Sequence, residues 1–63
     1  MINEFEQVRI KKSGITGTVV DIRTVEGEKI YTIEADEIGT PGGFGDDTGW
    51  KLYDCAAAEI EKV

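Results

Sequence analysis

Residues 17–34 read GTVVDIRTVEGEKIYTIE, and this stretch decides the fold because two runs rich in β-branched residues flank a short turn. The first run, Gly17 to Val25, and the second run, Lys29 to Glu34, each predict a β-strand. The segment between them, Glu26-Gly27-Glu28, contains a glycine that accepts the positive φ of a tight turn. The sequence therefore predicts a β-hairpin at the centre of the protein.

The alternation of apolar and polar residues predicts which side chains face the core. In the first strand of the hairpin we expect Val20 and Ile22 to point inward and Val19 outward, although adjacent valines also permit a register shifted by one residue. In the second strand, Tyr31 and Ile33 share the inward face. With the flanking strands, nine apolar residues form the predicted core: Val8, Ile10, Val20, Ile22, Tyr31, Ile33, Trp50, Leu52 and Ile60.

Three shorter strands are expected outside the hairpin. Alternating apolar residues predict one strand at Gln7 to Lys11 and another at Trp50 to Tyr53. The run Cys55 to Glu59 contains helix-forming residues and predicts one short helical turn, which precedes a last strand at Ile60 to Val63. These elements predict one all-β domain spanning residues 1–63, with five strands and a helical turn before the last of them.

Residues 35–49 are expected to form a flexible loop within this domain. Five glycines and Pro41 disfavour a strand or a helix there. The loop also contains four acidic residues: Asp36, Glu37, Asp46 and Asp47. Because carboxylates resist burial, we expect no other part of the small domain to hold the loop in place. The spacing of these acids matches no calcium-binding loop, and no metal site is predicted.

The glycine spacing near the first strand resembles a known family. Gly14, Gly17, Val19 and Ile22 follow the pattern G-x-x-G-x-V-x-x-I, which resembles the KOW motif of ribosomal proteins and transcription elongation factors. The five short strands resemble the SH3-like barrel. The resemblance implies a structural turn at Gly14 and Gly17, binding of nucleic acid or protein through loops and an exposed barrel face, and no enzymatic activity.

A second resemblance concerns the C-terminus. The stretch Ala58-Glu59-Ile60-Glu61 is similar to the end of small acidic bacterial barrel domains of unknown function. This similarity implies a fold but no activity.

The composition argues against several classes of function. The chain has 63 residues, no histidine and one cysteine, Cys55, so it lacks the usual general base near neutral pH and any intrachain disulfide. We expect Cys55 to be a small hydrophobic residue of the interior. We also expect no enzymatic activity, no cofactor and no metal, and a soluble, cytoplasmic protein without a membrane-spanning segment.

Acidic residues exceed basic ones, and the excess lies in the second half of the chain. Thirteen Asp and Glu against seven Lys and Arg give a net charge of −6. Residues 1–33 hold five acids and five bases, whereas residues 34–63 hold eight acids and two bases. Such a charge distribution favours a basic protein as the partner and repels the phosphates of nucleic acid.

The leading hypothesis is a non-enzymatic module that binds another protein through its acidic loop and second half. Phe44 is the candidate anchor, because a large apolar side chain flanked by glycines either folds back onto the domain or contacts a partner. Asp46 and Asp47 are expected to pair with Lys or Arg of that partner. If Tyr53 faces outward beside Phe44, the two rings form an aromatic shelf for a peptide.

The alternative is a weak RNA- or DNA-binding accessory domain of the KOW type. Such a domain would use the turn between Gly14 and Gly17 together with four nearby basic residues: Arg9, Lys11, Lys12 and Arg23. The competing interpretation is that these bases are the solvent-facing residues of strands and protect an edge against aggregation.

Overall fold

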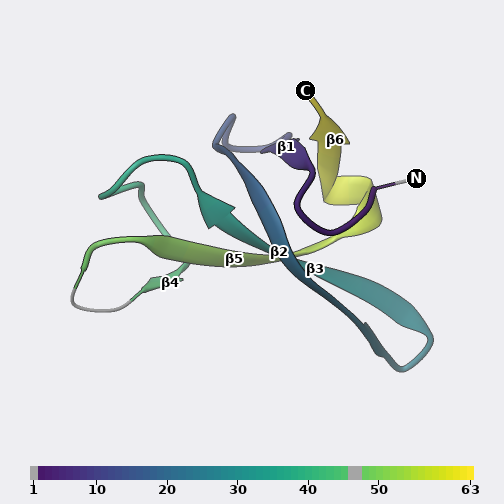
Figure 1. Cartoon of the computed structure of the whole chain (residues 1–63). Coiled ribbons are helices and arrows are strands. Elements are labelled where there is room, and N and C mark those ends of the chain that lie inside the picture. The colour runs from purple at the N-terminus through teal and green to yellow at the C-terminus, as the bar shows by residue number, and fades with distance from the viewer. Residues whose placement is uncertain (1, 46–47) are drawn as a thin grey trace.

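The computed structural model describes residues 2–45 and 48–63, and within them the chain is all-β, as the sequence predicts (Figure 1). Six strands form one antiparallel sheet in the order β4-β5-β3-β2-β1-β6, so the prediction of five strands is wrong for the described residues. The short 3-10 helix η1 (Ala57–Glu59) precedes the last strand. The strands are β1 (Gln7–Ile10), β2 (Thr16–Val25), β3 (Glu28–Ala35), β4 (Phe44–Gly45), β5 (Lys51–Ala56) and β6 (Ile60–Lys62).

The central hairpin forms as predicted. β2 and β3 pair along their lengths, and Val25 lies opposite Glu28 to close a turn of two residues. Glu26 and Gly27 in this turn have positive φ values of 50° and 82°. Turns of this kind match the right-handed twist of the strands they connect, and glycine adopts the second conformation without steric cost.

A β-bulge in β2 changes the predicted inward face of this strand. Val19 pairs with Ile33 and Asp21 pairs with Thr32, so Val20 is an extra residue between the two pairs. An extra residue in one strand reverses the alternation of faces beyond it. Val19 is therefore fully buried rather than exposed, and Val20 is half-buried rather than part of the core.

Most of the predicted core is confirmed, except at Val20 and around Trp50. Ile22 is partly buried and packs against the core, as Tyr53 does. Trp50 precedes β5 and is 38% exposed, and Leu52 is only half-buried, because β5 turns Tyr53 and Cys55 towards the core instead. The buried cluster consists of Val8, Ile10, Val19, Tyr31, Ile33, Cys55 and Ile60.

The glycine-rich loop contains the two-residue strand β4, contrary to the expectation that residues 35–49 contain no strand. Phe44 pairs with Leu52, and Gly45 pairs with Lys51. These pairs join β4 to the edge of β5. The backbone of the loop is therefore connected to the sheet near its C-terminal end.

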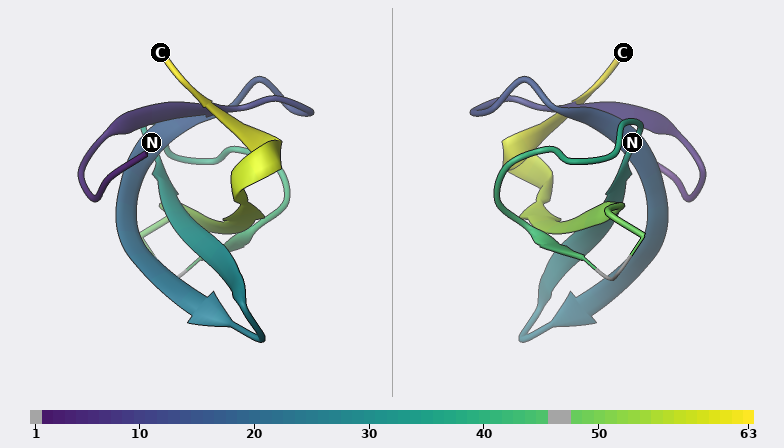
Figure 2. Two further views of the ribbon diagram at one scale, coloured as in Figure 1. Left: turned by 90° about the vertical axis from the view of Figure 1, so that its right-hand side faces the viewer. Right: turned by 90° about the vertical axis from the view of Figure 1, so that its left-hand side faces the viewer.

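The sheet curls around its core, but no ladder joins its two edge strands, β4 and β6, in the part of the chain that the structure describes (Figure 2). η1 begins at Ala57, two residues later than predicted, and leads into β6, which pairs with β1. The backbone N–H of Lys11 donates to the carbonyl oxygen of Glu59 at 2.9 Å, which connects η1 to the end of β1. A gap in strand pairing thus separates β1 and β6 from β4 and β5.

Candidate functional site

An exposed apolar cluster lies on the outer face of the sheet, opposite the core, and we call it the outer patch: Phe44, Trp50 and Leu52. Phe44 and Leu52 are directly opposite in an antiparallel pair, so their side chains share one face. Phe44 is 53% exposed and Trp50 is 38% exposed, although both are large and apolar. With Glu34 and Gly45, the three residues line a surface hollow of about 250 Å³.

Acidic side chains accompany the outer patch. Glu34 lies opposite Leu52 across β3 and β5, which places its exposed carboxylate beside the apolar side chains. Asp54 is two residues further along β5 and lies on the same face. The two acids predicted to bind the partner, Asp46 and Asp47, lie outside the described residues.

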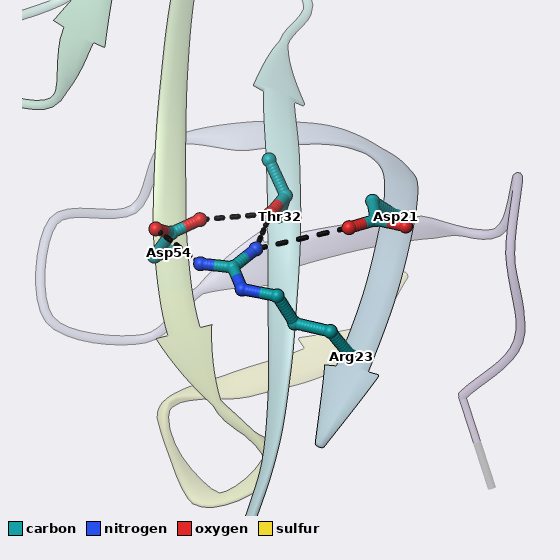
Figure 3. Close-up of polar contacts among 4 residues, drawn as sticks. All are labelled: Asp21, Arg23, Thr32 and Asp54. Carbon is teal, nitrogen blue, oxygen red and sulfur yellow. Dashed lines mark hydrogen bonds and ion pairs between the residues drawn. The ribbon is translucent and has the colours of Figure 1, made fainter. Parts of the chain in front are cut away.

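A polar network occupies the same face next to the outer patch (Figure 3). Arg23 donates to Asp54 Oδ2 at 2.8 Å and to Thr32 Oγ1 at 2.9 Å. The Thr32 hydroxyl, in a side chain that is nearly buried, donates in turn to Asp54 Oδ1 at 2.8 Å. Asp21 completes the network with an ion pair of 3.7 Å to Arg23. The network joins β2, β3 and β5. Within it, the positive charge of Arg23 is balanced by the carboxylates of Asp21 and Asp54.

The hydrogen bond from Thr32 lowers the pKa of Asp54, and Arg23 lowers it further. A carboxyl whose pKa is lower in the folded state stabilises the fold above its unfolded pKa, and this stabilisation is lost as the pH falls through the folded pKa. The ordinary pKa of Asp is about 3.9, so the loss occurs in acid below that value. The network therefore links part of the stability of the sheet to an ionised Asp54.

Thr32→Val is expected to lower the free energy of unfolding by about 1 kcal/mol at neutral pH, because it removes the hydroxyl and keeps the shape of the side chain. The difference from the wild-type protein should shrink as the pH falls through the lowered pKa of Asp54, because the hydroxyl of Thr32 stabilises the ionised carboxylate. Urea unfolding at neutral pH and at about pH 2.5 measures both values. Thr24→Val, the same substitution at an exposed site of β2, is the control. An equal loss at both pH values would show that Thr32 does not act through the carboxylate.

The four predicted nucleic-acid-binding bases do not gather in one place. Arg9 donates to Glu61 at 2.9 Å across β1 and β6. Arg23 lies seven residues beyond Thr16, the β2 partner of Arg9, which corresponds to roughly 20 Å along an extended strand. Lys11 and Lys12 are exposed in the turn after β1. Two of the four cations thus have carboxylate partners and one is remote from the rest.

The predicted turn glycines lie between β1 and β2 and at the start of β2. Gly14 has a φ of +78°, and its N–H donates to the carbonyl oxygen of Ile10 at 2.8 Å. Gly17 is buried opposite β3, where a Cβ atom would overlap the carbonyl oxygen of Glu34 and lie 2.7 Å from Cγ2 of Ile33. Both positions therefore have a structural reason for glycine.

Tyr53 lies on the opposite face of β5 from the outer patch, because neighbouring residues of a strand alternate between faces. Its ring packs against the core. Its hydroxyl donates to the carbonyl oxygen of Pro41 at 2.6 Å and lies 2.7 Å from Oγ1 of Thr40. Phe44 and Tyr53 nevertheless border one hollow, so an aromatic shelf made of the two rings stays a prediction. Through its hydroxyl, Tyr53 also holds the glycine-rich loop.

The glycine-rich loop makes further contacts with itself. The N–H of Gly39 donates to the carbonyl oxygen of Gly49 at 3.1 Å, and the side chain of Ile38 packs closely against Gly49. With the bonds of Tyr53, these contacts contradict the expectation that nothing in the domain holds the loop. The flexibility of residues 35–49 stays a prediction.

A second hollow, of about 670 Å³, opens at the gap in strand pairing, and we call it the seam cavity. Tyr53 and Cys55 of β5 form one wall, and Ile10 and Ile15 at the β1–β2 turn form another. Cys55 is buried, as predicted, and desolvation raises the pKa of its thiol. The thiol is therefore protonated at neutral pH and is a hydrophobic wall of the cavity rather than a nucleophile.

Comparison with family models, curated proteins and solved structures finds no match to this chain. Function is therefore inferred from the side chains themselves. Among residues 2–45 and 48–63, no three His, Cys, Asp or Glu side chains gather closely enough to hold a metal ion. The same residues contain no helix that is long and apolar enough to cross a membrane.

Proposed function

We propose that this protein is a non-enzymatic module that binds a basic segment of another protein through the outer patch. The observation that carries the proposal is that Phe44 and Trp50 are both exposed and line one surface hollow together with Leu52 of β5. Large aromatic side chains exposed together in a small protein are typical of interaction sites, and Trp is enriched among residues that dominate binding energy.

The charge of the chain supports a basic partner. Glu34 borders the outer patch, and Asp54 lies on the same face. Asp54 pairs with Arg23, which also pairs with Asp21, so two carboxylates share this cation. The whole chain carries a net charge of −6. Such a field speeds the association of positively charged partners and repels nucleic acid.

We further propose that the sheet is a relative of the SH3-like barrel, of the KOW type at its N-terminal half. The arrangement of Gly14 and Gly17 around the first turn, the tight β2–β3 hairpin, the long loop before β5 and the helical turn before the last strand support this assignment. β4 is an additional strand relative to the predicted five. The assignment concerns the fold and carries no activity by itself.

Phe44→Ala is expected to weaken binding of the native partner at least tenfold, because truncating a central aromatic anchor typically costs 2 kcal/mol or more. Its effect on stability should stay within about 0.5 kcal/mol, because the side chain is mostly solvent-exposed. The partner is captured from native cells on the immobilised protein, identified, purified and titrated against the variants. Trp50→Ala should weaken binding similarly.

Val25→Ala is the matched control, since Val25 is 48% exposed at the far end of the hairpin. An equal loss in Val25→Ala would contradict the assignment of the outer patch. The alternative function is tested by titrating mixed RNA and DNA oligonucleotides at low and moderate salt. Salt-sensitive oligonucleotide binding in the sub-micromolar range would overturn the proposal and favour the nucleic-acid-binding module.

A further inference from the structure

One edge of β5 is only half covered by another strand. On the side away from β3, β4 pairs with Lys51 and Leu52. Beyond them, residues 53–56 of β5 have no strand neighbour on that side among the described residues. An uncovered strand edge presents backbone donors and acceptors that another chain can pair with.

The backbone groups of Asp54 point to this uncovered edge. In an antiparallel strand, alternate residues direct their N–H and C=O groups to the same side. The carbonyl oxygen of Leu52 points towards the chain segment that leads into β4. A Cβ atom added at Gly43 would lie only 2.7 Å from this oxygen. The N–H of Ala56 donates to Oε1 of Glu59 at 2.8 Å rather than to β3. Asp54 lies midway between Leu52 and Ala56, so its N–H and C=O face the same side.

The seam cavity lies next to this edge. Asp54 and Cys55 of β5 border it, and Ile10 and Ile15 face them across the gap. Its volume of about 670 Å³ lies within the range of pockets that hold small ligands, and is large enough for a few side chains. The cavity therefore offers apolar walls beside a row of backbone hydrogen-bonding groups.

We propose that the uncovered edge of β5 binds an extended segment of another protein as an added antiparallel strand, with apolar side chains in the seam cavity and Lys or Arg between them. This site goes beyond the outer patch, because it uses the backbone edge of β5 and the seam cavity, and of the three patch residues only Phe44 borders that cavity. Backbone hydrogen bonds supply affinity in this mode of recognition, and pockets for alternate side chains supply specificity. Asp54 provides one donor and one acceptor, and Ala56 provides a further donor.

The carboxylate of Glu59 is the reason to expect Lys or Arg in the bound segment. In the free protein, this carboxylate accepts a hydrogen bond from the N–H of Ala56, so this edge donor already has a partner. When the carbonyl oxygen of an added strand accepts that N–H, the carboxylate is released beside the cavity and pairs with a cation of the segment. The other charged groups that border the cavity are Lys12 and Asp54, and the carboxylate of Asp54 is already bonded to Arg23.

Ala56→Pro is a sharp test of this proposal. Ala56 has a φ of −76°, which proline adopts, and its N–H makes no bond to β3, so the substitution removes one edge donor with little strain. Ala56→Ser keeps the N–H and is the matched control. Trp50→Ala alters the outer patch but no residue that lines the seam cavity. It therefore separates this site from the proposed function.

The probe is a displayed library of random decapeptides, selected on the immobilised full-length protein. We expect the selected peptides to alternate apolar residues with Lys or Arg. The synthesised peptides should bind Ala56→Pro at least tenfold more weakly than the wild-type protein, and should bind Ala56→Ser and Trp50→Ala within about twofold of it. On binding, the amide of Asp54 should exchange with solvent at least tenfold more slowly, as expected for a new hydrogen bond.

A second measurement does not depend on the folding of any variant. Each selected peptide is N-methylated at alternate residues in two versions, one for each edge of the peptide strand. One version should lose binding at least tenfold and the other should not, because only one edge of an added strand bonds to β5. The proposal is overturned if no peptide is selected, if both versions bind equally, or if folded Ala56→Pro binds as the wild-type protein does. Loss of binding in Trp50→Ala with retention in Ala56→Pro would assign the peptides to the outer patch instead.

Discussion

Gly17→Val is expected to lower the free energy of unfolding by about 3 kcal/mol, a large share of the total stability of so small a domain. Gly17 is buried in β2, and its backbone lies against β3. A Cβ atom there would overlap the carbonyl oxygen of Glu34 and lie 2.7 Å from Cγ2 of Ile33. The first obstacle is backbone held in a ladder and the second is a fully buried side chain, so neither moves cheaply.

Thermal unfolding measures the effect of Gly17→Val. A loss of about 3 kcal/mol corresponds to a decrease of roughly 10–25 °C in the melting temperature of a domain of this size. Thr24→Val introduces the same side chain at an exposed position of β2 and should change stability by less than about 0.5 kcal/mol. An unchanged melting temperature in Gly17→Val would show that β2 and β3 do not approach each other as described.

Val19→Ala is expected to destabilise the protein by about 2 kcal/mol, and Val20→Ala by less than about 1 kcal/mol. The two substitutions are chemically identical and adjacent in sequence. Val19 is fully buried opposite Ile33, so its truncation removes two methyl groups from the core and leaves a cavity. Val20 is the extra residue of the bulge and is only half-buried.

Urea unfolding of the two variants compares them directly. A larger loss in Val19→Ala supports the bulge, because without it the simple alternation from Ile22 would bury Val20 instead. The opposite order, with Val20→Ala the more destabilised variant, would contradict the register of β2 and β3. Each variant therefore serves as the control for the other.

The outer patch could be predicted from the sequence only in part. Phe44 is recognisable as a candidate anchor because glycines flank this large apolar residue in a polar loop. The alternation of apolar residues instead predicts that Trp50 and Leu52 lie in the core. A shift of one residue in the pairing register moves every side chain of a strand to the other face, and Trp50, Leu52 and Tyr53 are large apolar or aromatic residues that suit either face.

The seam cavity and the edge of β5 were beyond sequence reasoning. Ile10 and Ile15 come from one turn and Cys55 from β5, and only the curl of the sheet brings them to one cavity. The loop contacts of Tyr53 were missed for a similar reason, since its hydroxyl reaches a carbonyl oxygen 12 residues away. Contacts between distant segments depend on the twist of intervening strands, which the residue pattern does not specify in detail.

The sequence by itself determined the all-β class, the central hairpin and the position of its turn, because alternation, β-branched residues and Gly27 act between neighbours along the chain. Only the tertiary structure decided that Val19 rather than Val20 is buried and that β4 adds a sixth strand in the described chain. The tertiary structure also decided that Trp50 is on the surface. Judged from its neighbours in the sequence alone, each of Val19, Val20 and Trp50 fits a buried and an exposed position about equally well. The choice follows from pairing with a strand that is distant in sequence, because a bulge or a one-residue change of pairing register moves every following side chain to the other face.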